Sequence, residues 1–256
     1  MTEKTLRSDM AFSTADRIVV RGHDLAELIG RVSLGDFAFL ELKGRLPTKE
    51  ESTVFNAIVV ALVEHGMTPS TIAARMTYLG APEAFQAAVA AGLLGMGDRF
   101  GGSVEEAART LQDALEHAAP DAHLRPIALT IVAGYKQRKQ PVAGLGHPVH
   151  KPTDPRTPRL FAVAAENGFS SRYVELMELI SEEASRSYGR PLPVNATGAI
   201  AAIASELEIP WRTCRGLAVM ARAIGLVAHL QEEIKDPIAG EIWSRVEEES
   251  SEHLRG

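Results

Sequence analysis

Apolar residues recur every three or four positions along most of the chain, which is the period of an amphipathic helix. After Thr48, a residue type that often stands at a helix N-cap, Val54, Ile58 and Leu62 fall on one face and Glu51 completes a capping-box pattern. The same spacing, with proline before and glycine after several segments, predicts helices at residues 47–66, 69–79, 82–96, 104–118, 126–139, 158–167, 171–187, 199–208 and 211–233.

The alternation of apolar and polar residues that strands require is almost absent. Residues 18–21 predict a short strand, and little else does. The composition agrees, because the 256 residues include 37 alanines and only 5% aromatic residues, whereas strands prefer aromatic and β-branched side chains. We therefore predict an all-α fold without internal repeats. We expect the charged run at residues 247–255 to be a solvated tail.

Composition narrows the class of protein. The chain is 45% hydrophobic with a net charge of −6, which is typical of a globular protein and not of a nucleic-acid binder with a basic surface. No stretch approaches the ~18 consecutive apolar residues that cross a bilayer, and residues 1–14 lack the apolar core of a signal peptide. The single cysteine, Cys214, is expected to be buried and unreactive. We expect a cytoplasmic protein that acts on a small molecule, without nucleic-acid or membrane partners.

Three glycine- and proline-rich stretches interrupt the predicted helices, at residues 95–102, 144–158 and 189–198. Each also contains polar or charged residues. Such stretches are either helix punctuation or loops in which the backbone approaches a ligand closely. Their occurrence three times in one chain favours ligand-binding loops.

His65 lies near the predicted end of its helix, between Glu64 and Gly66. The negative end of a helix favours an imidazolium by about 0.3–1 kcal/mol. His65 is therefore either a partner of the helix dipole or a group that binds the carboxylate or hydroxyl of a small acid.

His147 and His150 lie three residues apart in the second loop, followed by Lys151, Arg156 and Arg159. Two histidines at this spacing are weak evidence for a metal, and prolines prevent a regular helix from aligning them, so we expect no metal. A histidine that polarises a carbonyl or stabilises an alkoxide is the better functional interpretation. The positive charge suits phosphates or carboxylates, or forms a solvated basic loop.

Arg222 stands in an otherwise apolar run. An unpaired buried guanidinium is costly, so Arg222 either meets a protein carboxylate or binds an anionic ligand. Asp98 and Arg99, which are adjacent, either turn in different directions or anchor the first loop.

Taken in order, these motifs resemble the citrate synthase superfamily. Four segments are similar to family motifs: L-K-G-R-L-P-T-K-E-E at 42–51, E-H-G at 64–66, G-L-G-H-P-V-H-K-P-T-D-P-R at 144–156 and M-A-R-A-I-G-L-V-A-H-L-Q-E at 220–232. The resemblance covers residues 18–233. Within the superfamily, G-D-R-F-G-G at 97–102 is similar to the citryl-CoA lyase branch, including the lyase module of ATP-citrate lyase. Citrate synthases have histidine where Phe100 stands.

The resemblance implies a citrate synthase-like fold of two helical lobes that forms a homodimer or a higher homo-oligomer. The expected large lobe comprises residues 1–102 and 197–256, and the small lobe on the CoA side comprises residues 103–196. The active site would lie between the lobes. The implied partners are a CoA thioester substrate and a 2-oxo acid, with no tightly bound cofactor.

The resemblance also implies roles for individual residues. The expected catalytic residues are His147, His65, Thr197 and Asp98. The expected substrate-binding residues are Arg222, Asn195, Phe100 and Arg99. The expected CoA-binding residues are Lys151, Arg156, Arg190, Gly144 and Gly146.

The chain departs from the family pattern at two positions. Pro148 replaces the arginine that follows the loop histidine, and Thr197 stands where the family has its catalytic aspartate, which moves a proton at the acetyl carbon. A threonine hydroxyl is no general base near pH 7, so Glu64, Asp98 or a histidine would have to take this role.

Three functions follow from the resemblance. The first is a lyase that cleaves citryl-CoA, or a related 3-hydroxyacyl-CoA, to acetyl-CoA and a 2-oxo acid such as oxaloacetate. The second is condensation of the citrate or methylcitrate synthase type, against which Phe100 and Thr197 both argue. The third is a non-catalytic protein that binds CoA or an acid.

Overall fold

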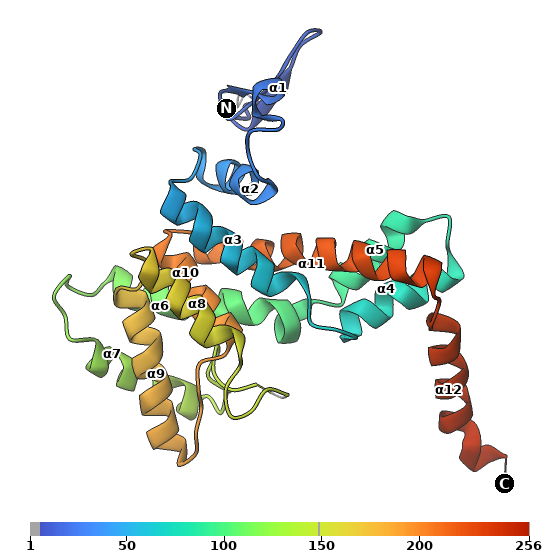
Figure 1. Ribbon diagram of the computed structural model, residues 1–256. Coiled ribbons are helices and arrows are strands. Elements are labelled where there is room, and N and C mark those ends of the chain that lie inside the picture. Colours follow the sequence, from blue (N-terminus) through green and yellow to red (C-terminus); the bar gives the residue numbers. More distant parts are fainter. Residues whose placement is uncertain (1–5, 148, 256) are drawn as a thin grey trace, which may run out of the picture.

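The computed structural model describes residues 6–147 and 149–255, without the side chain of Arg99 (Figure 1). Helices dominate it, as predicted. They are α1 (Leu25–Leu28), α2 (Leu34–Lys43), α3 (Lys49–Val63), α4 (Pro69–Gly80), α5 (Phe85–Leu94), α6 (Ser103–Glu116), α7 (Leu124–Gln137), α8 (Arg156–Glu166), α9 (Arg172–Tyr188), α10 (Ala196–Glu206), α11 (Trp211–Lys235) and α12 (Ala239–Ser251). A π-helical turn at Gly97–Gly102 leads into α6.

The N-terminal segment forms a small antiparallel sheet in the order β1 (Ala11–Ser13), β2 (Ile18–Val20) and β3 (His23–Asp24). The predicted strand at residues 18–21 corresponds to β2. With α1, this segment projects from the helical body (Figure 1). The all-α prediction is confirmed, because the sheet is a short addition to it.

The predicted helix starts reflect local chemistry. The Thr48 side chain accepts the N–H of Glu51, whose carboxylate accepts the N–H of Thr48, and this capping box begins α3 as predicted. In contrast, α5 begins at Phe85 and not at Pro82, because a turn closed by the Ala84 N–H and the Ala81 carbonyl precedes it.

Three helices lie outside the predicted ranges: α1, α2 and α12. Helix α2 was not predicted, although Ser33 caps its start. Residues 247–255 are mostly exposed, as the predicted solvated tail requires, but they are helical, because α12 continues to Ser251 and one 3₁₀ turn follows at Glu252–Leu254. Its side chains are mostly exposed, and only Ala239 at its start is fully buried. Its polar composition therefore suggested a tail, although glutamate is a good helix former.

Helix α10 is the centre of the core. Ala199, Ile200, Ala201, Ala202 and Ala204 are all fully buried there. Small side chains allow α6, α8 and α9 to pack closely against it, and α3 covers a further part of its surface. The run of alanines thus serves helix packing.

Helix α11 connects this core to an arm that contains α4 and α5 (Figure 1). Leu226 and Leu230 of α11 form a second, smaller core with Ala74 and Ala88. By length and composition α11 is the one described helix that passes as a membrane span. It packs against α3, α4, α5 and α6, as the core helix of a folded domain does. The absence of a membrane partner stays a prediction, as do the lobe boundaries.

Gly225 sets how closely α11 approaches the end of α3. A Cβ atom at Gly225 would lie 2.3 Å from the carbonyl oxygen of Val63, the last residue of α3. Gly216 lies in the same helix, is exposed, and has nothing within 4 Å of the corresponding position. The two glycines therefore differ in packing and not in helix propensity.

We expect Gly225→Ala to lower the free energy of unfolding by about 1–3 kcal/mol, because the backbone of α3 cannot yield to the added methyl group without shifting. Gly216→Ala is the matched control and is expected to raise stability by up to ~1 kcal/mol, since alanine is the better helix former. Urea unfolding followed by circular dichroism measures both. Equal effects of the two substitutions would contradict the close approach.

Candidate active site

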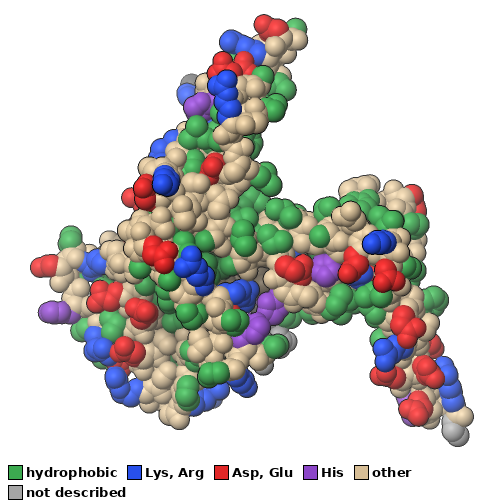
Figure 2. Space-filling model, viewed as in Figure 1, with side chains coloured by type: hydrophobic (Ala, Val, Ile, Leu, Met, Phe, Trp, Pro, Cys, Tyr) green, Lys and Arg blue, Asp and Glu red, His purple; other side chains and the backbone are tan. Residues whose placement is uncertain are grey.

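Three histidine rings form the centre of the site. His65 follows α3, and His147 and His150 lie in the loop between α7 and α8. The Nε2 atoms of His65 and His150 are 3.1 Å apart, and the rings of His147 and His150 stack with centroids 4.3 Å apart. The ring of His65 lies 5.4 Å from that of His147. Figure 2 shows histidine side chains together at the surface, in the angle between the helical body and the arm.

The hydrogen bonds of His147 define which of its ring nitrogens carries the proton. Its Nδ1 atom accepts the backbone N–H groups of Val149 (3.1 Å) and His150 (3.0 Å). A neutral imidazole that accepts at Nδ1 carries its proton at Nε2. His147 can therefore donate a hydrogen bond from Nε2 to an oxygen atom placed before it.

The three rings also offer nitrogen atoms within 4.8 Å of one another, which is a spacing that could suit a metal ion. A metal-binding imidazole coordinates through a lone pair and holds its proton on the other nitrogen. His147 has the opposite arrangement, with its Nδ1 lone pair engaged by the backbone. The geometry thus favours a hydrogen-bond donor at His147, and the expectation of no metal stays a prediction.

The surroundings of His65 and His147 lower the pKa of both side chains and so favour their neutral form. Burial lowers the pKa of His65, and the positive charges of Arg156 and Arg222 lower it further. Burial also lowers the pKa of His147. The expectation of an imidazolium at the helix end is therefore wrong for His65. The reason is that burial and neighbouring guanidinium groups oppose the charge, and that residue 64 is already in extended conformation.

Glu64 fixes the position of the His65 loop. Its Oε1 atom accepts the backbone N–H groups of His65 (2.8 Å) and Gly66 (2.6 Å), and the Nε2 atom of His229 lies 3.1 Å from the same oxygen. These hydrogen bonds lower the pKa of Glu64 against the opposing effect of burial. Glu64 is thus an ionised positioning group.

Arg222 lies in the middle of α11, close enough to His65 for its charge to lower the pKa of that imidazole. Its Nη1 atom is buried and has no hydrogen-bond partner among the residues that the structure describes. Burial lowers the pKa of Arg222, while the charge of Glu64 opposes this shift and the charge of Arg156 reinforces it. Of the two alternatives that the sequence left open, this arrangement favours an anionic ligand, because a guanidinium N–H is directed at no protein oxygen.

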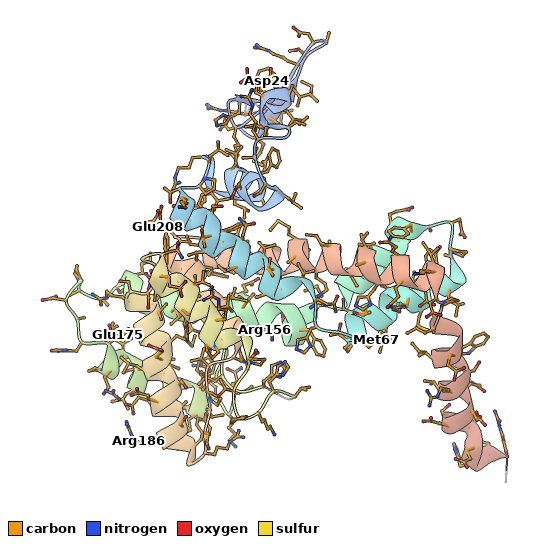
Figure 3. All side chains as sticks on the ribbon, viewed as in Figure 1. Asp24, Met67, Arg156, Glu175, Arg186 and Glu208 are labelled. Atoms are coloured by element: carbon orange, nitrogen blue, oxygen red, sulfur yellow. The ribbon has the colours of Figure 1, made fainter. Side chains whose placement is uncertain are left out.

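Arg156 lies near the same charges and is labelled at the start of α8 in Figure 3. It forms two hydrogen bonds to Asp154, at 3.1 and 2.9 Å, and a third to the carbonyl of Ala61. The Asp154 carboxylate also accepts the N–H of Ala196 at the start of α10. These hydrogen bonds lower the pKa of Asp154 to about 2, although its burial acts in the opposite direction.

A cavity of about 650 Å³ adjoins the histidines. His147 and His150 belong to its wall, which also contains Lys151, Arg190 and Gly146. Lys151 and Arg190, two of the predicted CoA-binding cations, therefore line the same cavity. Arg156, the third, is not part of this wall, because Asp154 and the end of α3 hold it beside the imidazoles.

Gly144 and Gly198 allow the loop to contact α10. A Cβ atom at Gly198 would lie 2.4 Å from the Gly144 oxygen, and one at Gly144 would lie 2.7 Å from the Gly198 Cα atom. Gly144 has a φ of +84°, a conformation that suits glycine. Gly144 is thus a buried packing residue, while Gly146 lines the cavity.

Asn195 and Thr197 occupy the start of α10. The Asn195 side chain caps the helix by accepting the N–H of Gly198, and it donates to the carbonyl of Gly146 at 2.5 Å. The Thr197 hydroxyl donates to the Asn195 oxygen at 2.6 Å. Both residues hold the histidine loop, and their direct contact with substrate stays a prediction.

The first glycine-rich loop contains three of the predicted site residues, Asp98, Arg99 and Phe100. Asp98 pairs with Arg215 at 2.7 Å and its side chain is 90% exposed. Arg215 precedes Arg222 by seven residues, or about 10 Å along the helix. Phe100 is 51% exposed, and the side chain of Arg99 lies outside the described residues. The catalytic role of Asp98 and the substrate-binding roles of Phe100 and Arg99 stay predictions.

His150 is the residue whose position the sequence analysis undervalued. The sequence offered His150 as a metal ligand beside His147, or as one of the histidines that could replace the missing aspartate, without distinguishing it from the others. Its contact with His65, from a segment 85 residues away, depends on the packing of α8 against α3. The motif itself contained the signal, since a third imidazole in a loop with a proposed catalytic histidine is a titratable group at the site.

Comparison with known proteins defines the class. The citrate synthase C-terminal domain matches residues 49–243, which is most of the chain. The chain therefore belongs to the citrate synthase family, and its fold is citrate synthase-like, as predicted.

Individual relatives give more detail than the family match does. The chain is similar to the structure of citryl-CoA lyase from Hydrogenobacter thermophilus, with 35% identity, a TM-score of 0.82, and coverage of 91% of this chain and 88% of the other. An ATP citrate lyase from Methanosaeta concilii, solved with (3S)-citryl-CoA, shares the fold at 20% identity and a TM-score of 0.75, over 92% and 40% of the two chains.

A curated relative from Arabidopsis thaliana, ATP-citrate synthase beta chain protein 2, is 27% identical over 90% of this chain and 38% of its own length. The chain thus spans about two fifths of this relative.

The Asp154 ion pair makes stability depend on pH. The folded pKa of Asp154, about 2, lies below its ordinary value of 3.8, so the ionised carboxylate stabilises the folded state above pH ~4. We expect Asp154→Asn to lower the free energy of unfolding at pH 7 by about 3 kcal/mol, because Arg156 loses its buried partner. The difference from the wild type should shrink as pH falls from 4 toward 2.

The matched control is Asp121→Asn, which changes an exposed aspartate. Chemical unfolding at several pH values measures both variants. A pH-independent difference for Asp154→Asn would show that the carboxylate charge is not what stabilises the loop.

Proposed function

We propose that this protein is a carbon–carbon lyase that cleaves a 3-hydroxyacyl-CoA, with citryl-CoA as the first candidate, to acetyl-CoA and a 2-oxo acid such as oxaloacetate. One observation carries the proposal: His147 and His150 line a cavity together with Lys151 and Arg190, His150 contacts His65, and the charge of the buried Arg222 acts on His65. The similarity to citryl-CoA lyase supports the same assignment.

The proposed partner of the reacting β-hydroxyl oxygen is His147. Cleavage breaks the bond between the α and β carbons of the thioester, and the β hydroxyl becomes the ketone of the oxo acid. Charge develops on this oxygen as its proton leaves. The Nε2 proton of His147, whose position the backbone fixes, is suited to stabilise that charge by a hydrogen bond.

The proposed partner of the oxo-acid carboxylates is Arg222. Arg222 has an unpaired N–H group and a reduced pKa, both of which an anion would relieve. Arg156 adds positive charge nearby, although Asp154 neutralises part of it. The result is a site whose unbalanced charge is positive, as a dianionic product requires.

The proposed binding site for the CoA part of the substrate is the cavity. Lys151 and Arg190 bring positive charge to a wall that otherwise contains several prolines and leucines. Phosphates of CoA would meet the cations and its organic chain would meet the apolar wall. His147 and His150 then mark the end of the cavity where the thioester would lie.

Oligomeric state and location belong to the same proposal. Apolar side chains are exposed on the arm (Figure 2), and Val227 and Ile234 of α11 and Trp243 and Val246 of α12 are also exposed. A homodimer would cover such a surface. We further propose a cytoplasmic enzyme that uses the CoA ester as a substrate and no tightly bound cofactor.

Incubation of the purified protein with citryl-CoA tests the function. We expect release of oxaloacetate, followed with malate dehydrogenase and NADH, together with an equal amount of acetyl-CoA. Arg222→Gln should lower kcat/KM by about 10–100-fold, because a charge-assisted hydrogen bond to the substrate is lost. Arg212→Gln is the matched control, since Arg212 lies on the same helix, exposed and stacked on Trp211.

No oxaloacetate at high enzyme concentration would remove citryl-CoA as the substrate. Formation of free thiol from acetyl-CoA and oxaloacetate, without cleavage, would favour the condensing enzyme. Binding of CoA without turnover in either direction would favour a non-catalytic protein.

A double substitution tests the CoA cavity. We expect Lys151→Ala with Arg190→Ala to weaken CoA binding by about 10–100-fold in isothermal titration calorimetry, because the phosphates lose two cations. Affinity of the wild type should also fall with added salt more steeply than that of the variant. Lys235→Ala, an exposed lysine at the end of α11, is the control. An unchanged dissociation constant would place CoA elsewhere.

A further inference from the structure

The proposed cleavage leaves one reacting atom without a partner. When the carbon–carbon bond breaks, its electron pair passes to the α carbon of the thioester as an enolate. That carbon must then receive a proton to become the methyl group of acetyl-CoA. A group that can give a proton is therefore needed at the inner end of the CoA cavity.

The carboxylates near the site are engaged elsewhere. Asp154 is bound to Arg156, and its pKa of about 2 makes it a poor proton carrier at neutral pH. Glu64 accepts two backbone N–H groups and faces His229. Asp98 pairs with Arg215 at an exposed position. None of these three groups belongs to the cavity wall.

The other candidates are no better placed. The Thr197 hydroxyl directs its proton to Asn195, and a hydroxyl is too weak an acid for this step. The tautomer of His147 assigns its Nε2 proton to the substrate oxygen. Lys151 is a cation of the proposed CoA site.

His150 lies at the cavity and can also carry a proton. It belongs to the cavity wall, and its Nε2 atom is 3.1 Å from that of His65, which faces the proposed acid site. Its ring stacks on His147, which keeps it at the point where the cavity reaches the imidazoles. Imidazole is the side chain best suited to proton transfer near neutral pH.

We propose that His150 is the catalytic residue that carries the proton at the α carbon of the CoA thioester, and that it works as a relay with His65. This inference rests on the proposed lyase function. The substrate hydroxyl gives its proton to His65, His65 passes a proton across the Nε2–Nε2 hydrogen bond, and His150 gives a proton to the enolate carbon. The O–H and C–C bonds break, the C=O and C–H bonds form, and no proton is gained or lost overall.

The relay predicts an activity that needs no carbon–carbon bond cleavage. In D₂O, with malate in the oxo-acid site, wild-type protein should exchange the methyl hydrogens of acetyl-CoA for deuterium, which NMR detects. His150→Gln should lower this exchange, and citryl-CoA cleavage, by about 10²–10⁴-fold. Its dissociation constant for acetyl-CoA should stay within threefold of the wild-type value. The glutamine retains hydrogen bonding but cannot carry the proton.

Controls separate this inference from loss of structure and from the proposed function. His150→Ala should regain exchange when imidazole is added to the solution, which a misfolded variant would not do. His117→Gln removes an exposed histidine after α6 and should exchange like the wild type.

Two results would overturn the relay alone: cleavage and exchange at wild-type rates in His150→Gln, or their loss in Thr197→Val while His150→Gln stays active. Wild-type protein that neither cleaves citryl-CoA nor exchanges acetyl-CoA would refute the lyase function together with the relay.

Discussion

The site depends on a backbone contact between Gly144 and Gly198. Neither position has room for a Cβ atom, so the loop before α8 lies directly against the start of α10. Asn195 adds a hydrogen bond to Gly146 from the same helix start. Because α10 is buried on nearly every side, the loop that carries His147 and His150 is attached to a helix in the centre of the core. Catalytic side chains on such a loop lose little freedom when a substrate binds.

A second set of contacts places His65 opposite that loop. Gly225 lets α11 pass close to the end of α3, and Glu64 then holds the backbone that follows. Glu64 is linked through His229 to Arg75, which is fully buried and paired with Glu233 at 2.7 Å. The packing of α4 on α11 is therefore connected to the histidines by ionic hydrogen bonds. Arg222, on α11 itself, enters the site by the same approach of the helices.

Burial is the main cause of the lowered pKa of His65 and of His147, and the charges at the site act in addition. Arg156 and Arg222 lie close enough to His65 to lower its pKa, while Asp154 exerts the opposite effect. The negative charge of an incoming dianion would oppose this shift and raise the pKa of His65. Binding of the acid would thus make His65 a better acceptor for the hydroxyl proton.

The sequence by itself determined the helical class, most helix starts and the family. Capping residues such as Thr48, prolines at helix starts and the apolar period are local signals, and the G-L-G-H-P-V-H-K-P-T-D-P-R motif lies in one continuous stretch. It could not supply α12 as a helix, because that segment has few buried side chains to produce a period.

Tertiary structure alone decided which residues act together. The contact of His65 with His150 spans 85 residues, and the unpaired state of Arg222 depends on burial between helices. The place of Arg156 beside Asp154, and not at the CoA cavity, depends on the approach of α8 to α3. Local sequence encodes dihedral preferences and faces, whereas distances and burial arise only when distant helices pack.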